Sequence, residues 1–452
     1  MKLSTWACAW VMTGCLLMGD AMAQQLRQPI SVQPAGFDYN RYLQDEASPS
    51  DAPAPVAISD QAEGTSNHAP VVHMSSAADC CDTGCDSGCD SGCDSCCSTS
   101  CISLSNWCNL GDAFTISESL FGECSPWTAG GWVQVGYTDR STGLFNNIPG
   151  EVLVNQSWAY IEREANGECC WDWGFRADVM YGTDGTDTQA FGNPAGSWDF
   201  ENGFDHGIYS WALPQLYGVL EKGDLSVKLG HFYTLVGYEV VPAPNNFFYS
   251  HSYTMVESEP FTHTGALATY TVSDNLEVYG GWTAGWDTGF DRLDGGSNFL
   301  GGFSASLMDD LSLTYITTIG DFGLRGSDGY MHSLVIDANL TCNLNYVFQS
   351  DYLHVESTGE DNIGINQYLF YTVNDCVSVG SRVEWWKFDP LAAGESMISV
   401  YEATFGVNIR PHANVIVRPE IRENWAPSSN AANYLDGDIN GTIFAVDAIV
   451  TF

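Results

Sequence analysis

From residue 127 to the last residue, apolar side chains alternate with polar or small ones in segments of ten to thirteen residues. In the clearest segment, Trp171, Trp173, Phe175, Ala177, Val179 and Tyr181 share one face, and Asp172, Gly174, Arg176 and Asp178 share the other. A period of two predicts β-strands. Aromatic rings at both ends of the apolar face are typical of a strand that crosses a bilayer, because such rings favour the water boundary.

Short and long connections alternate between these segments. The short ones are rich in Asp, Asn and Gly, which suit tight turns, and they fall at 165–168, 221–224, 273–275, 308–310, 341–343, 374–376 and 411–414. The long ones fall at 140–152, 182–210, 234–262, 287–297, 321–329, 356–361, 389–398 and 426–438. Seven short and eight long connections join sixteen strands. An even number of strands with both ends on the short-turn side is typical of bacterial outer-membrane barrels.

The final segment supports the same interpretation. Phe444, Val446, Ala448 and Val450 alternate with other residues up to Phe452, a pattern similar to the terminal signal of outer-membrane barrels. The alternative is a soluble β-sandwich, propeller or β-helix. No repeat of fixed length supports a propeller. Aromatic residues at both ends of an apolar strand face have no role in a soluble fold. We therefore predict an all-β protein, a transmembrane antiparallel barrel of about sixteen strands over residues 127–452.

Composition narrows the functional classes. Charged residues are 16% and aromatic residues 13%, and 15 Lys and Arg stand against 56 Asp and Glu, a net charge of −41. Nucleic acid is excluded as a partner, because phosphate binding needs a positive surface. A helical membrane bundle is excluded as well, since no run of 18 apolar residues follows the extreme N-terminus.

The N-terminal region divides into segments of different character. Residues 1–23 read as a signal peptide, with Lys2, an apolar stretch and Ala21-Met22-Ala23; a lipoprotein signal at Cys15 is the weaker alternative. Residues 24–79 are rich in Pro, Ala, Ser, Gln and Asp and are predicted to be a disordered linker. Residues 102–126 are predicted to form a short helical or plug-like lead-in to the barrel.

Between linker and lead-in, residues 80–101 form a cysteine repeat of Cys-Asp-Ser-Gly units. Thiolates at this spacing could bind a soft metal, but disulfides are favoured outside the cytoplasm. Nine cysteines from Cys80 to Cys108 are an odd number, so one remains for another molecule or for Cys124. Cys342, Cys376 and the Cys169-Cys170 pair lie in or beside short turns, and their pairing stays open.

Several Gly- and aromatic-rich motifs resemble a known family, the OmpL-like outer-membrane β-barrel porins. The motifs are 130–137, 229–239, 249–253, 262–265 and 281–287, and the resemblance covers roughly 127–452. It implies an outer-membrane channel for passive or weakly selective diffusion, without catalytic residues. Two further expectations come from sixteen-stranded general porins: a third long loop that narrows the lumen, and assembly as a homotrimer.

The polar faces supply candidate pore residues. On the wall these are Arg176, Asp178, Lys228, Arg382, Glu384, Arg418, Glu420 and Arg422, and on the third long loop they are Glu239, Glu257 and Glu259. Acidic groups on the loop facing basic groups on the wall would create a transverse field that favours small polar solutes and ions. The alternative is that these charges only keep the lumen wet. The net charge of −41 predicts mild cation selectivity.

Other chemistry finds little support in the sequence. Residues 436–447 resemble a calcium loop but overlap the last strand, and His251 and His263 lack any pattern that fixes a hydrolase site. We expect no enzymatic activity, no cofactor and no bound metal. The alternative function is a structural or adhesive envelope protein, anchored in outer-membrane lipid by the barrel and linked to neighbours by disulfides from Cys80–Cys108.

Overall fold

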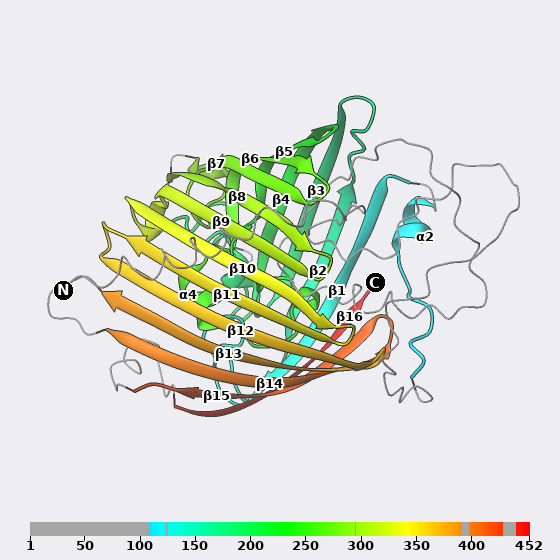
Figure 1. Cartoon of the computed structure of the whole chain (residues 1–452), viewed down its shortest axis with the longest axis vertical. Helices are drawn as coiled ribbons and strands as arrows, with labels where there is room; N and C mark the ends of the chain where they lie inside the picture. Colours follow the sequence, from blue (N-terminus) through cyan, green and yellow to red (C-terminus); the bar gives the residue numbers. More distant parts are fainter. Residues whose placement is uncertain (1–107, 123–124, 204, 294, 391–396, 428–439) are drawn as a thin grey trace, which may run out of the picture.

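The computed structural model describes residues 108–122, 125–203, 205–293, 295–390, 397–427 and 440–452, and these form a closed antiparallel barrel of sixteen strands (Figure 1). The strands are β1 (Trp127–Thr138), β2 (Val152–Arg163), β3 (Asp172–Gly182), β4 (Ser210–Lys222), β5 (Leu225–Tyr233), β6 (Thr262–Ser273), β7 (Leu276–Thr283), β8 (Ser297–Met308), β9 (Leu311–Asp321), β10 (Gly329–Thr341), β11 (Leu344–Val355), β12 (Glu360–Asn374), β13 (Val377–Pro390), β14 (Ile398–His412), β15 (Val415–Trp425) and β16 (Gly441–Thr451). Each strand pairs with the next, and β16 pairs with β1. The predicted fold class is confirmed.

Successive residues of a strand point to opposite faces. Closure of the barrel therefore places one set of alternating side chains outside and the other set inside. Outward residues such as Trp173, Phe405 and Phe444 are exposed, whereas residues of the opposite face in the same strands, such as Arg176, Thr404 and Ala445, are buried inside. An apolar exterior around a polar interior is the pattern of a barrel surrounded by lipid.

Six of the seven predicted short turns are two-residue connections between neighbouring strands. The turn between β2 and β3 is longer than predicted, spanning 164–171. Asp172 explains the extension, because its carboxylate accepts a bond from Asn166 N (2.9 Å) and pairs with Arg163 (3.2 Å), which closes a wider loop.

The long connections leave from the opposite end of the barrel and carry the short helices. These are α3 (Gly185–Thr188), α4 (Tyr253–Ser258), η3 (Ala243–Asn245), η4 (Phe290–Arg292) and η5 (Gly323–Arg325). No helix among the described residues is both long and apolar enough to cross a membrane. Parts of four predicted long loops, namely residues 204, 294, 391–396 and 428–439, lie outside the described residues.

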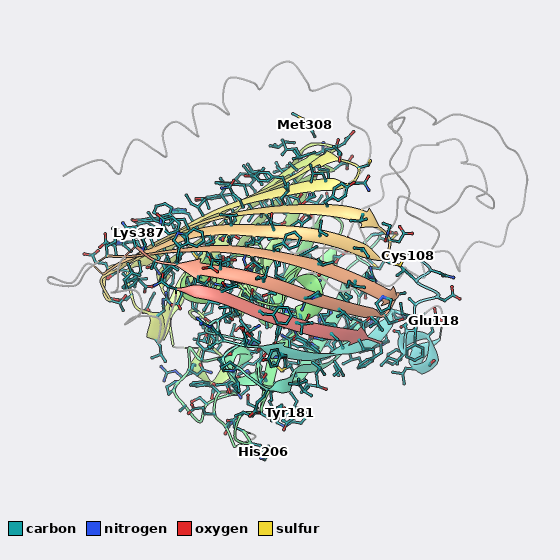
Figure 2. The ribbon with its side chains drawn as sticks, turned by 90° about the horizontal axis from the view of Figure 1, so that it is seen from below. Cys108, Glu118, Tyr181, His206, Met308 and Lys387 are labelled. Atoms are coloured by element: carbon teal, nitrogen blue, oxygen red, sulfur yellow. A yellow bond between two sulfur atoms is a disulfide. The ribbon has the colours of Figure 1, made fainter. Side chains whose placement is uncertain are left out.

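The lead-in crosses the short-turn end of the barrel. Cys108 forms a disulfide with Cys376 of the β12–β13 turn, with a Cα–Cα distance of 5.8 Å. Asn414 then accepts a bond from Phe114 N (2.7 Å) and donates to Phe114 O (2.8 Å), and α2 (Ser117–Phe121) follows. Figure 2 places Cys108 and Glu118 at one end of the barrel and Lys387 at the other.

The disulfide pairs two cysteines whose partners the sequence left open. The remaining N-terminal predictions, namely the signal peptide at 1–23, the disordered linker at 24–79 and the cysteine repeat at 80–101, lie outside the described residues. Within the lead-in, Phe114 and Leu120 are exposed.

Candidate functional site

The connection between β5 and β6, residues 234–261, folds back into the barrel, and we call it the inner loop. It carries η3 and α4, which contact β16 and the strands β11–β13 respectively. Figure 1 shows α4 among the strands, within the barrel. The third long loop of the sequence therefore lies in the lumen.

Apolar contacts hold the inner loop against the wall. Its aromatic residues Tyr238, Phe247 and Phe248 are buried with Tyr368 and Phe370 of β12. Removing such side chains from water stabilises this packing by roughly 25 cal/mol for each Å² of apolar surface.

Two glycines of the wall allow the loop backbone to approach this closely. A Cβ at Gly136 of β1 would overlap the Tyr249 hydroxyl, and a Cβ at Gly364 of β12 would overlap Thr254. Both positions point inward, so the absence of a side chain provides the room that the loop occupies.

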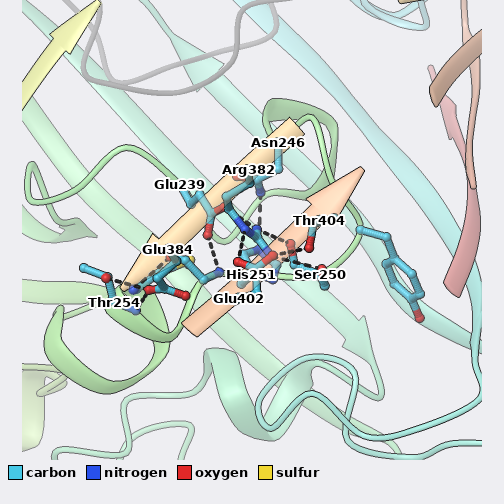
Figure 3. Close-up of polar contacts among 12 residues, drawn as sticks. Glu239, Asn246, Ser250, His251, Thr254, Arg382, Glu384, Glu402 and Thr404 are labelled. Atoms are coloured by element: carbon cyan, nitrogen blue, oxygen red, sulfur yellow. Dashed lines mark hydrogen bonds and ion pairs between the residues drawn. The ribbon is translucent and has the colours of Figure 1, made fainter. Parts of the chain in front are cut away.

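Arg382 of β13 is the central charged contact between wall and loop (Figure 3). Its Nη1 donates to Glu239 Oε1 (2.6 Å) and to Ser250 O (2.8 Å), both on the inner loop. Its Nε donates to Glu402 Oε2 of β14 (2.8 Å). Since all three charged side chains are buried, this ion-paired cluster is geometrically fixed rather than solvated.

Two wall carboxylates accept bonds from the loop backbone. Glu384 of β13 accepts from Tyr253 N (2.7 Å) and Thr254 N (2.6 Å), the first residues of α4. Glu420 of β15 accepts from Tyr249 N (2.8 Å). A carboxylate suits the position of Glu384 because the N–H groups of a first helical turn have no partner within the helix.

Two further arginines of β15 bind loop carbonyls. Arg418 Nη1 donates to Ala243 O (2.9 Å), and its Nε donates to Asp447 Oδ1 (2.9 Å) of β16. Arg422 Nη1 donates to His251 O (2.6 Å). Wall guanidinium groups therefore donate to the loop's carbonyl oxygens, and wall carboxylates accept from its N–H groups.

The three predicted loop carboxylates have different surroundings. Burial, the largest single influence, would raise the pKa of Glu239, but the Arg382 guanidinium, the His251 side chain and the bond from Ser252 N together outweigh burial and hold that pKa below its usual value. Burial, followed by the Asp351 carboxylate, holds the pKa of Glu259 well above its usual value, and Gln349 donates to Glu259 (2.6 Å). Glu257 is half-buried.

The other predicted wall residues lie away from these loop contacts, on β3 and β5. Arg176 is paired with Glu162 (2.8 Å) and Asp178 (2.7 Å). Lys228 is half-buried, with its Nζ 4.5 Å from the centre of the Tyr217 ring. The structure thus brings together Arg382, Glu384, Arg418, Glu420, Arg422 and Glu239, and separates Arg176, Asp178 and Lys228 from that group.

The sequence reasoning did not identify Glu402 and Asp447 as partners of these arginines. Both occupy inward positions, at Glu384↔Glu402 and Arg418↔Asp447 of the paired strands. A cross-strand search for opposite charges on inward faces would have found the pair between Arg418 and Asp447. Among the described residues, no group of three or more His, Cys, Asp or Glu side chains could hold a metal ion.

A second buried acidic site connects α3 to the wall. Asp184 accepts bonds from Asn155 Nδ2 (3.2 Å) and Gln156 Nε2 (3.1 Å), and Asp187 accepts one from Phe145 N (2.8 Å). Burial, and then the Asp187 charge, raise the pKa of Asp184 to about 7. Burial raises the pKa of Asp187 to about 6.

These shifts predict a pH dependence of stability. Because the folded protein holds a proton on Asp184 that the unfolded chain releases, the free energy of unfolding should rise as pH falls from 8 to 5. In Asp184→Asn this rise should be smaller. The measurement is the urea midpoint of the detergent-solubilised protein at both pH values. Asp309→Asn, at an exposed turn position, is the control, and an unchanged pH slope in Asp184→Asn would contradict the prediction.

Comparisons with known proteins agree with the geometry. The family model described as "Putative beta-barrel porin-2, OmpL-like" matches residues 126–452. No curated protein matches the chain significantly.

Several solved structures are similar to this chain. A structure titled "Asymmetric conductivity of engineered proteins" is 15% identical, with 72% of this chain and 100% of that chain covered and a TM-score of 0.47. A mutant porin of Rh. blastica is 14% identical, with 72% and 100% covered and a TM-score of 0.46. OmpT of Vibrio cholerae, in its trimer form, is 11% identical, with 72% and 99% covered and a TM-score of 0.45.

Proposed function

The chain belongs to the OmpL-like β-barrel porin family and is an outer-membrane porin, and from this premise we propose that it passes small polar solutes by passive diffusion. In this proposal the inner loop narrows the lumen and determines which solutes pass. The observation that carries the proposal is the position of the loop inside the closed barrel, where buried charges bind it to the wall. Sixteen strands enclose a lumen wide enough for water and small solutes.

The constriction in this proposal has two sides. The loop side carries Glu239, Glu257 and Glu259, and the wall side, on β3 and β5 away from the polar contacts of the loop, carries Arg176, Asp178 and Lys228. The wall residues Arg382, Glu384, Arg418, Glu420 and Arg422 act differently, because their charges hold the loop in place. Planar-bilayer recording of the refolded protein tests the proposal: discrete ohmic steps support it, and a silent bilayer contradicts it.

We expect mild cation selectivity. The described arginines at the loop are paired with carboxylates or backbone carbonyls, so the net charge of −41 should dominate the potential at the channel mouths. A reversal potential measured in a salt gradient should therefore have the sign of cation preference, and the preference should weaken at high salt. A reversal potential of the opposite sign would contradict the prediction.

The alternative is a structural envelope protein whose barrel serves only as an anchor. The Cys108–Cys376 disulfide favours an oxidising compartment, yet it joins the extension to its own barrel rather than to another molecule. Gels run with and without reductant test this alternative, which requires reductant-sensitive oligomers. Assembly as a homotrimer stays a prediction, for which the measurement is the mass of the detergent-solubilised protein. No enzymatic activity is proposed.

A further inference from the structure

The end of the inner loop meets the wall through two carboxyl groups rather than through an ion pair. Glu259, which follows α4, accepts a bond from Gln349 Nε2 of β11 (2.6 Å), and Asp351 of the same strand accepts from the same nitrogen (3.0 Å). The two carboxyl groups also hydrogen-bond to each other. Both are buried, with 6% of Glu259 and 1% of Asp351 exposed.

No cation balances this pair. None of the ion pairs formed by the described residues includes Glu259 or Asp351. The charged and titratable groups that face Glu259 are Asp351 of β11, Glu239 of the inner loop and Tyr368 of β12. The neighbouring strands β10 and β13 present Ser333 and Trp386, which do not titrate. Two ionised carboxylates would therefore repel each other where water solvates them poorly.

A proton resolves this conflict. A hydrogen bond between two carboxyl groups needs a proton on one of them, because an ionised carboxylate only accepts. Burial and the Asp351 carboxylate both favour the protonated form of Glu259, since they hold its pKa well above the usual value. The proton thus supplies the donor that an arginine supplies where Glu239 meets the wall.

The carboxyl pair connects both ends of the inner loop to the wall. Ser333 Oγ donates to Asp351 Oδ1 (2.7 Å) and accepts from Gly237 N (3.3 Å), near the start of the loop. Gly237 has a φ of 87°, and a Cβ there would overlap Glu259 Oε2. Glycine at this position lets the start of the loop lie against the carboxyl group at its end.

We propose that Glu259 and Asp351 form a proton-dependent clasp, which holds the inner loop against β10 and β11 and opens at alkaline pH to widen the channel. On opening, the O–H bond of the Glu259 carboxylic acid breaks, the proton passes to water, and two carboxylates remain. Since the folded protein holds this proton above the pKa of an exposed carboxyl group, the clasp is closed at acidic pH and is lost as pH rises. The widening rests on the proposed function, in which the loop narrows the lumen, whereas the clasp does not.

Single-channel recording of the refolded protein from about pH 5 to about pH 9 is the first test. The conductance of the wild type should rise with pH. Glu259→Gln, whose amide keeps both bonds but has no proton to lose, should stay at the low value throughout. Glu259→Ala, which removes the clasp, should stay at the high value throughout. Asp309→Asn, in the exposed turn between β8 and β9, is the control and should titrate as the wild type does.

Two outcomes of these recordings would overturn the proposal. One is an equal pH dependence in the wild type and in Glu259→Gln. The other is a rise in wild-type conductance at neutral pH on addition of a metal chelator, because a cation rather than a proton would then neutralise the pair.

Infrared difference spectroscopy measures the proton itself and does not need a conducting channel. At neutral pH the carbonyl stretch of a protonated carboxylic acid should be stronger in the wild type than in Glu259→Gln, and the difference should disappear as pH rises. A silent bilayer together with this titrating band would support the clasp and contradict the proposed function. A conducting channel with the same band in both proteins would support the proposed function and overturn the clasp.

Discussion

Replacing Arg382 by methionine should lower the free energy of unfolding by about 3–5 kcal/mol, the usual cost of removing one partner from a buried ion pair. Glu239 and Glu402 would then remain buried without their counter-charge. The inner loop would also lose the bond from Arg382 to Ser250 O. Urea unfolding of the detergent-solubilised protein measures the change, and limited proteolysis should show earlier cleavage within 234–261.

Lys387→Met is the matched control for this prediction, because Lys387 lies on the same strand. Its ion pair with Asp389 (3.3 Å) is partly exposed, and such surface pairs contribute about 0–1 kcal/mol. The variant Arg382→Met/Glu239→Gln/Glu402→Gln removes all three charges and should recover part of the lost stability. If Arg382→Met were no less stable than Lys387→Met, the buried cluster would not be what holds the loop.

Excision of the inner loop should increase single-channel conductance several-fold, because the loop occupies the lumen. The two ends of the loop lie side by side, since Tyr233 of β5 is paired with Thr262 of β6. Residues 235–260 can therefore be replaced by a four-residue Gly/Ser turn that joins neighbouring strands. The arginines and carboxylates of the wall would then face water, so the folded barrel should persist with lower stability.

Asp309→Asn, in the exposed short turn between β8 and β9, is the control for the excision, because it retains the inner loop and its contacts with Arg382, Arg418 and Arg422. Its conductance should stay close to that of the wild type. A folded excision variant, verified by its β-sheet circular dichroism, with wild-type conductance would show that the narrowest part of the channel lies elsewhere.

The architecture could be predicted because its determinants are local in sequence. Alternation in segments such as 171–181 sets the two faces of a strand, and Asp, Asn and Gly clusters mark the turns. The same alternation predicts that Arg382, Glu384 and Arg418 point inward, and the structure agrees with this direction. The unexpected length of the 164–171 turn comes from side-chain bonds of Asp172, which turn composition alone does not encode.

The contacts of the inner loop could not be predicted, because they join residues far apart in the chain. Arg382 binds Glu239 across a separation of 143 residues. The alternation of residues along a strand predicts which face a side chain occupies, but it does not predict the partner of that side chain. One signal was nevertheless present in the sequence: glycine at the inward positions Gly136 and Gly364, where a lumen exposed only to water would tolerate a side chain. Inward glycines in a strand indicate that another part of the backbone comes close.

The pairing of β1 with β16, which places Trp132 opposite Thr451, has a consequence for biogenesis. The hydrogen-bonding edge of β1 has no partner until the other fifteen strands have been delivered, so the nascent chain carries an open, aggregation-prone edge throughout its export. Contacts at such sequence separation also form slowly, because a very long loop must first be closed. We therefore expect the polypeptide to need holdase chaperones in transit, and depletion of those chaperones should lower the yield of newly assembled barrels before it affects those already assembled.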